Sequence, residues 1–181
     1  MSAVGHPVGP PDAGAFEAFV REYQDMVYAV ALRLLARPAD AEDVAQTVFL
    51  LAYERFASLH GHPTVAGWLK TVATNQSLKH LTRYRSRWRL FSEMGSSGDD
   101  WRSFDARAAP DDPSAAIDEA QRQARLEQAL ARLPDAQRVP LVLFHFEQFS
   151  YDEIASRLAL PVGTVKTHIH RGRRELRTWL S

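Results

Sequence analysis

The segment that most constrains the fold of this chain spans residues 150–177, where the pattern predicts two short helices on either side of a tight turn. Ser150 and Glu153 have the spacing of a capping box, so a helix is predicted to begin directly after Ser150. Pro161 and Gly163 are turn-forming residues and are predicted to make the connection. Such a helix pair is a common device for placing a helix in a DNA groove.

The second helix of this segment is predicted from about Val162 and has two distinct faces. Its apolar stripe repeats at spacings of four, three and four residues, as one face of a helix does: Val165, Ile169, Gly172 and Leu176. Its polar face carries cations, hydroxyls and a histidine: Thr164, Lys166, Thr167, His170, Arg171 and Arg174. Because Lys, Arg and Thr donate to base edges and phosphates, this face is predicted to contact DNA. The alternative is an amphipathic helix whose basic face is merely solvated.

Helical periodicity dominates the rest of the chain, and no segment alternates as a strand would. Helices are predicted over about Ala15–Ala36, Asp40–Ser58, Val65–Arg87 and Ser114–Arg132, with another from near Asp135. Pro38 is predicted to stop the first helix, and Pro140 to kink or delay the last of these. The expected fold class is all-α, with a three- to four-helix N-terminal domain, a flexible linker and a C-terminal helix-turn-helix domain.

Composition sets the expected domain boundaries. Residues 1–14 are rich in Pro and Gly and are predicted to be a disordered tail. Residues 15–91 form the N-terminal domain, residues 92–113 have the composition of a linker, and residues 114–181 form the C-terminal domain. A linker of that length spans roughly 70–80 Å when fully extended.

Charge is segregated along the chain although the formal net charge is zero. Residues 61–91 carry 6 cations and no anions, and residues 136–181 carry 7 cations and 4 anions. Residues 1–60 and 92–135 are net acidic. Two separate basic blocks indicate two contacts with one polyanion.

Several functional classes are excluded or disfavoured by what the sequence lacks. No apolar run approaches 18 residues, so no membrane insertion is expected, and no signal peptide is recognisable. The absence of Cys excludes disulfides, thiol catalysis and Cys-based zinc sites, and it fits a reducing cytoplasm. The closely spaced histidines at 60/62 and 168/170 lack carboxylates at ligand spacing, so no metal or other cofactor is expected. No catalytic triad, phosphate loop or carboxylate pair argues for an enzyme.

The chain resembles the extracytoplasmic-function (ECF) sigma factors, the minimal two-domain specificity subunits of bacterial RNA polymerase. The resemblance is carried by the run Asp40–Gln46, the stretch from Trp68 to Asn75, the Leu133–Pro134 pair and the segment 150–166. It covers about residues 15–91 and 115–180 in order. It implies a region 2 domain, which binds core polymerase and the −10 promoter element, and a region 4 domain, which binds the −35 element.

The resemblance also implies roles for individual residues. Those matching the polymerase-docking surface are Asp43, Gln46, Thr47 and Tyr53, with Thr47 standing where the family usually has an acidic residue. Those matching the −10 reader are His60, Gly61, His62, Asn75, Lys79, Arg83, Arg85 and Arg87. Lys166, Thr167, His170 and Arg171 match the −35 readers. Core RNA polymerase, double-stranded −35 DNA and melted −10 DNA are the implied partners, and an anti-sigma factor is the implied regulator.

Two rival interpretations remain open at this stage. A stand-alone helix-turn-helix regulator would bind a palindromic operator as a dimer, without polymerase. An enzyme with an appended DNA-binding tail would need a catalytic site that the sequence does not display.

Overall fold

A computed structural model describes residues 13–82 and 113–180, and within these ranges the chain forms helices joined by short connections and contains no strand. The expected all-α fold class is confirmed. The chain divides into two units, Met1–Arg83 and Tyr84–Ser181, each with its own core.

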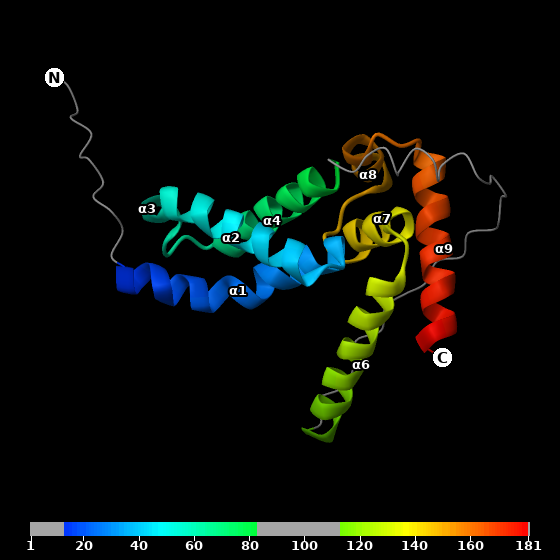
Figure 1. The fold of residues 1–181 in the computed structure, drawn as a ribbon, viewed down its shortest axis with the longest axis horizontal. Coiled ribbons are helices and arrows are strands. Elements are labelled where there is room, and N and C mark those ends of the chain that lie inside the picture. The colour runs from blue at the N-terminus through cyan, green and yellow to red at the C-terminus, as the bar shows by residue number, and fades with distance from the viewer. Residues whose placement is uncertain (1–12, 83–112, 181) are drawn as a thin grey trace. The chain divides into compact units, whose positions relative to one another are not determined.

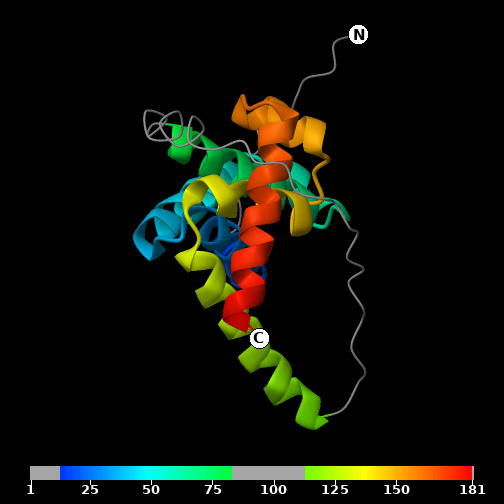
Figure 2. The ribbon, with the colours of Figure 1, turned by 90° about the vertical axis from the view of Figure 1, so that its right-hand side faces the viewer.

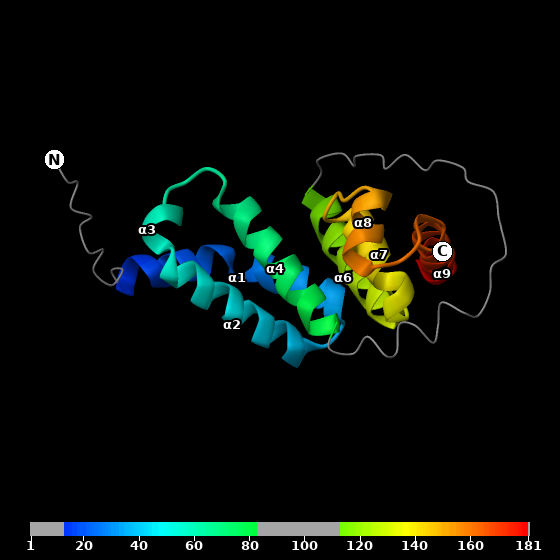
Figure 3. The ribbon, with the colours of Figure 1, turned by 90° about the horizontal axis from the view of Figure 1, so that it is seen from above.

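The first unit contains three helices that pack side by side and one short helix at a turn (Figures 1 and 3). They are α1 (Ala13–Leu35), α2 (Pro38–Glu54), α3 (Phe56–Leu59) and α4 (Val65–Thr82). The chain reverses direction between α1 and α2 and again between α2 and α4 (Figure 3). The largest side chains that are fully buried here are Val27, Leu34, Val48 and Leu69. This core holds the outer faces of α2 and α4 in place.

The helix boundaries around α2 differ from the prediction for a physical reason. The first helix ends before Pro38 as predicted, at Leu35, and Pro38 itself opens α2, where its missing N–H costs nothing. The helix predicted to continue to Ser58 ends at Glu54, because Arg55 leaves the helical conformation at φ −115°, ψ 12°.

The second unit consists of a long helix followed by a three-helix head (Figure 2). Its helices are α6 (Pro113–Arg132), α7 (Asp135–His145), α8 (Tyr151–Leu158) and α9 (Val162–Leu180), and α9 packs against the other three. The delayed start predicted for the helix that holds Pro140 is wrong, since α7 begins at Asp135 and continues through that proline. The N–H that Pro140 lacks would have bonded Ala136, in the first turn of α7.

The helix-turn-helix forms as predicted at its start and differently at its turn. Ser150 accepts from the Glu153 N–H at 3.3 Å, and Glu153 accepts from the Ser150 N–H at 2.8 Å, so the capping box is confirmed. The turn is made by Ala159 in the left-handed region at φ 53°, and the Leu160 N–H closes it on the Ala155 carbonyl at 3.0 Å. Gly163 lies inside α9, so the prediction that it punctuates the turn is wrong.

Two packing features fix α7 against the rest of its unit. A Cβ added at Gly172 of α9 would lie 2.9 Å from Leu141 Cδ1, so glycine lets α7 and α9 pack together without displacing the Leu141 side chain. Arg138 is buried and donates to the Leu133 carbonyl at 2.8 Å and to the Asp135 carboxylate at 2.6 Å. The buried Arg138 guanidinium therefore binds both Leu133, which follows α6, and Asp135, the first residue of α7.

Candidate protein-docking and nucleic-acid interfaces

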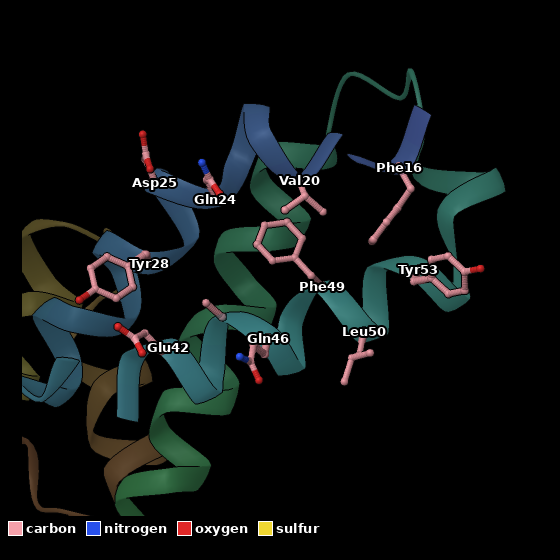
Figure 4. Close-up of a pocket in the computed structure, with 11 residues that line it drawn as sticks. Phe16, Val20, Gln24, Asp25, Tyr28, Glu42, Gln46, Phe49, Leu50 and Tyr53 are labelled. Carbon is pink, nitrogen blue, oxygen red and sulfur yellow. The ribbon is translucent and has the colours of Figure 1, made fainter. Parts of the chain in front are cut away.

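The outer side of α1 and α2 forms a largely apolar groove of about 960 Å³ (Figure 4). Phe49 of α2 turns toward Val20 of α1, whereas Leu50 points away from α1. The side chain of Leu50 is 68 % exposed and that of Tyr53 is 42 % exposed. The groove is lined by Phe16, Val20, Gln24, Asp25, Tyr28, Glu42, Ala45, Gln46, Phe49, Leu50 and Tyr53, none of which is a cation.

The four residues expected to dock a protein partner are all exposed on α2, and only two of them line the groove. Gln46 and Tyr53 line it, while Asp43 and Thr47 are exposed beside it. The Thr47 hydroxyl donates to the Asp43 carbonyl at 2.9 Å, so its hydrogen bond is made within α2. The contribution of α1 to the groove, including Phe16, Val20 and Tyr28, was not predicted from the sequence, because it depends on how α1 packs beside α2.

The end of the groove rests on an aromatic cluster. Phe16 meets the Tyr53 ring edge-on with centroids 5.0 Å apart, and it meets the Phe56 ring edge-on at 5.3 Å. Phe56 in turn packs against the His60 ring at 4.9 Å. The cluster thus connects the groove to the loop between α3 and α4 through ring contacts.

The loop between α3 and α4 is shaped by its own residues. Gly61 adopts φ +75°, a conformation that other residues reach only with strain, and the space around it is open. His62 Nδ1 lies 2.9 Å from the Thr64 hydroxyl and accepts from the Thr64 N–H at 3.4 Å. His62 therefore offers only its Nε2 side outward, while His60 leans on Phe56.

The outward face of α4 continues from this loop. Thr71, Asn75, Lys79 and Thr82 recur every three or four residues and are all exposed. Asn75 lies about 15 Å along the helix from its first residue, so loop and Asn75 form an extended surface and not one small pocket. Arg83, Arg85 and Arg87, also expected in this interface, lie outside the described residues.

The outward face of α9 is cationic along the whole helix. Lys166, His170, Arg174 and Arg177 are exposed at spacings of four, four and three residues. Thr164, Thr167 and Arg171 are half-buried on its flanks. The predicted apolar stripe is confirmed, because Val165, Ile169, Gly172 and Leu176 are all buried.

Two histidines of the second unit were not assigned a structural role from the sequence. His168 is buried, and burial holds its pKa below the usual 6.5, with the Arg171 charge adding to the effect. Burial also lowers the pKa of His145, and the neighbouring Arg173 charge lowers it further. Arg173 Nε donates to His145 Nε2 at 2.9 Å, which requires an unprotonated Nε2. Both imidazoles are thus neutral parts of the α7–α9 packing.

Two negative findings concern the described residues, 13–82 and 113–180. Among them, no group of three or more His, Cys, Asp or Glu side chains is placed to hold a metal ion. None of their helices combines the length and apolar character needed to cross a membrane.

These observations define a class before any comparison: an all-helical protein of two units, one with a hydrophobic groove and one with a helix-turn-helix whose outer face is cationic. Residues 19–87 match the family model for Sigma-70 region 2, and residues 123–176 match that for Sigma-70, region 4.

Two sigma factors with 31–32 % identity agree with both matches. ECF RNA polymerase sigma factor SigW of Bacillus subtilis is 32 % identical over 171 residues, which cover 93 % of this chain and 90 % of the relative. RNA polymerase sigma-H factor of Pseudomonas aeruginosa is 31 % identical, over 90 % of this chain and 84 % of the relative. The sigma factor RpoE of Bartonella quintana, solved with the anti-sigma factor NepR, covers 91 % of this chain at 22 % identity and a TM-score of 0.47.

The chain belongs to the family of ECF RNA polymerase sigma factors, and it acts in the initiation of transcription.

Proposed function

We propose that this sigma factor docks on core RNA polymerase through the outer face of α2 and the adjoining groove. The observation that carries the proposal is the pair of exposed apolar side chains Leu50 and Tyr53 beside Gln46. Exposed apolar residues next to acidic ones, with no cation among them, suit a protein partner and repel a polyanion. Asp43 and Thr47 extend this docking face along α2.

The −10 reading surface follows the loop and the outward face of α4. His60, Gly61 and His62 supply the loop, and Asn75 and Lys79 continue along the helix. A protein that opens DNA needs a site for an unstacked base and cations that follow the strand. The basic residues Arg83, Arg85 and Arg87 would extend that path and complete a region 2 domain at residues 15–91.

The −35 reading surface is the outer face of α9, in a region 4 domain at residues 114–181. In a helix-turn-helix the N-terminal part of the second helix meets the base edges while the first helix crosses the backbone. Thr164, Lys166 and Thr167 therefore face bases, and His170, Arg171 and Arg174 follow. Residues 92–113 link the two domains, and residues 1–14 are a tail.

The protein performs no chemistry of its own in this proposal, and it works in the cytoplasm because transcription takes place there. The acidic stretches of the chain oppose its two basic blocks, so DNA binding depends on polymerase to bring both reading surfaces to one promoter. Regulation by an anti-sigma factor that covers these surfaces is proposed on family membership.

Reconstitution tests the proposal directly. The purified chain is passed over core RNA polymerase, and run-off transcription is then measured on a library of promoter fragments. Binding to core and initiation at a subset of fragments are the expected results. Failure to bind core, or tight binding to a palindrome without polymerase, contradicts the proposal and favours a stand-alone regulator.

A further inference from the structure

Two aromatic rings and two cations form a short ladder on the helix-turn-helix. The rings of Phe144 (α7) and Tyr151 (α8) stack with centroids 4.6 Å apart and planes only 8° from parallel. Lys166 Nζ lies 5.5 Å from the centre of the Tyr151 ring, and the Arg173 guanidinium lies 5.6 Å from that of Phe144. Both cations belong to α9. The ladder thus joins all three helices of the head of the second unit.

The position of Lys166 makes this contact consequential. Lys166 is exposed on the outward face of α9, in its second turn, where a helix-turn-helix meets DNA. A free lysine side chain loses rotamer entropy when it is fixed in one geometry. A cation within about 6 Å of an aromatic face gains roughly 0.5–1 kcal/mol at an exposed site. The attraction to the ring therefore offsets part of the entropy that the Lys166 side chain loses, before DNA binds.

Tyr151 is itself well fixed for this task. Its ring is stacked on Phe144, and its backbone directly follows the Ser150–Glu153 capping box. Burial raises the pKa of the Tyr151 hydroxyl, so the ring stays neutral across the physiological range. The ring belongs to α8 and stacks on Phe144 of α7, so the direction of Lys166 depends on helices other than its own.

We propose that Tyr151 is a positioning residue for promoter recognition, whose ring face holds the Lys166 ammonium in the direction from which it contacts the −35 DNA. The proposal rests on the proposed function, because it requires that Lys166 contacts promoter DNA. Tyr151 itself does not touch the DNA in this arrangement; it acts through Lys166. A ring contact leaves the other N–H groups of the ammonium available to a base edge or phosphate.

A double-mutant cycle in the reconstituted holoenzyme tests the coupling. Wild-type holoenzyme first selects a promoter from a randomised −35 library, and the affinity for that fragment is then measured at fixed salt. Tyr151→Leu is expected to weaken binding about two- to fivefold, the equivalent of the cation–ring contact. Tyr151→Phe keeps the ring face and is expected to bind within about twofold of wild type. In a Lys166→Ala background, Tyr151→Leu is expected to cause no further loss.

A second variant separates positioning from packing. Pentafluorophenylalanine in place of Tyr151 keeps an aromatic ring but withdraws the electron density that attracts a cation. It is expected to behave as Tyr151→Leu does in the affinity assay while unfolding at a temperature close to that of Tyr151→Phe. This variant carries the test if Tyr151→Leu fails to fold.

The outcomes distinguish the inference from the proposed function. Equal losses from Tyr151→Leu with and without Lys166, or full affinity with the fluorinated ring, overturn the inference while the wild-type holoenzyme still initiates. No effect of Lys166→Ala on affinity also overturns it, since no lysine contact is then being positioned. A wild-type chain that initiates nowhere overturns both.

Discussion

The outer faces of α2 and α9 show how one chain presents two different surfaces. Both helices are long, 17 and 19 residues, and both bury one stripe in the core of their own unit. The exposed side chains of α2 include Leu50, Tyr53 and acidic residues but no cation. Those of α9 include Lys166 and Arg174 but no anion. Both buried stripes are mainly apolar, so the outer faces carry the difference in partner.

The largest effect is expected from a cation on the docking face. Leu50→Lys places a charge where an apolar contact is proposed and should weaken core polymerase binding at least about 30-fold, the effect of losing a central contact. Because Leu50 is 68 % exposed, the thermal unfolding midpoint should stay the same. Ala18→Lys is the matched control, since Ala18 is exposed on α1 but does not line the groove. Equal losses of core polymerase binding in both variants would show that the docking face of α2 differs in no special way from the rest of the surface.

The reciprocal change removes cations from α9. Lys166→Ala combined with Arg171→Ala should weaken −35-dependent initiation about 30-fold, because two base contacts are removed and each contributes roughly 1 kcal/mol or more. Binding to core polymerase should be unchanged, as measured by titration with labelled core. The salt dependence of promoter binding should also become shallower. A loss of core binding would show that α9 is not specialised for DNA.

A smaller effect concerns the buried side of α9. Gly172→Val forces side-chain atoms toward Leu141 and Gln137 and should destabilise the second unit by about 2 kcal/mol, as overpacking does. Gly67 in α4 has open space around it, so Gly67→Ala should stabilise the first unit by about 0.5–1 kcal/mol. Urea unfolding resolved by residue-specific NMR signals would measure each. Similar responses at both glycines would contradict the close approach of α7 and α9.

The last prediction uses pH to separate the units. Burial holds the pKa values of His145 and His168 below 6.5, so the unfolded chain binds protons more readily than the folded unit does. Their contribution is fully present above about pH 6.5 and is lost as the pH falls below it, toward the folded pKa values. The urea midpoint of the second unit should fall over this range. Replacing both histidines, with His145→Gln and His168→Leu, should flatten the profile, and an unchanged midpoint in the wild type would disprove the lowered pKa values of the two imidazoles.

Much of the fold could be predicted because local signals agreed with tertiary packing. The capping box at Ser150 and the stripe from Val165 to Leu176 follow from residue spacing alone, and both are confirmed. The connection was predicted at Pro161 and Gly163 because both are common turn residues, yet Ala159 adopts the left-handed conformation that makes the turn. The surrounding helices determine where the chain must reverse, and alanine accepts the strain.

The sequence by itself determined the class of fold, the two units and the outward cations of α9, since periodicity and charge are local properties. Only the tertiary structure decided what lies beside those residues. The groove exists because α1 and α2 bring Phe16, Val20 and Phe49 together from distant positions. The Tyr151 ring lies near Lys166 because α7, α8 and α9 converge. Contacts between separate helices depend on how their faces pack, and the spacing of residues along one helix does not predict which residues of another helix it meets.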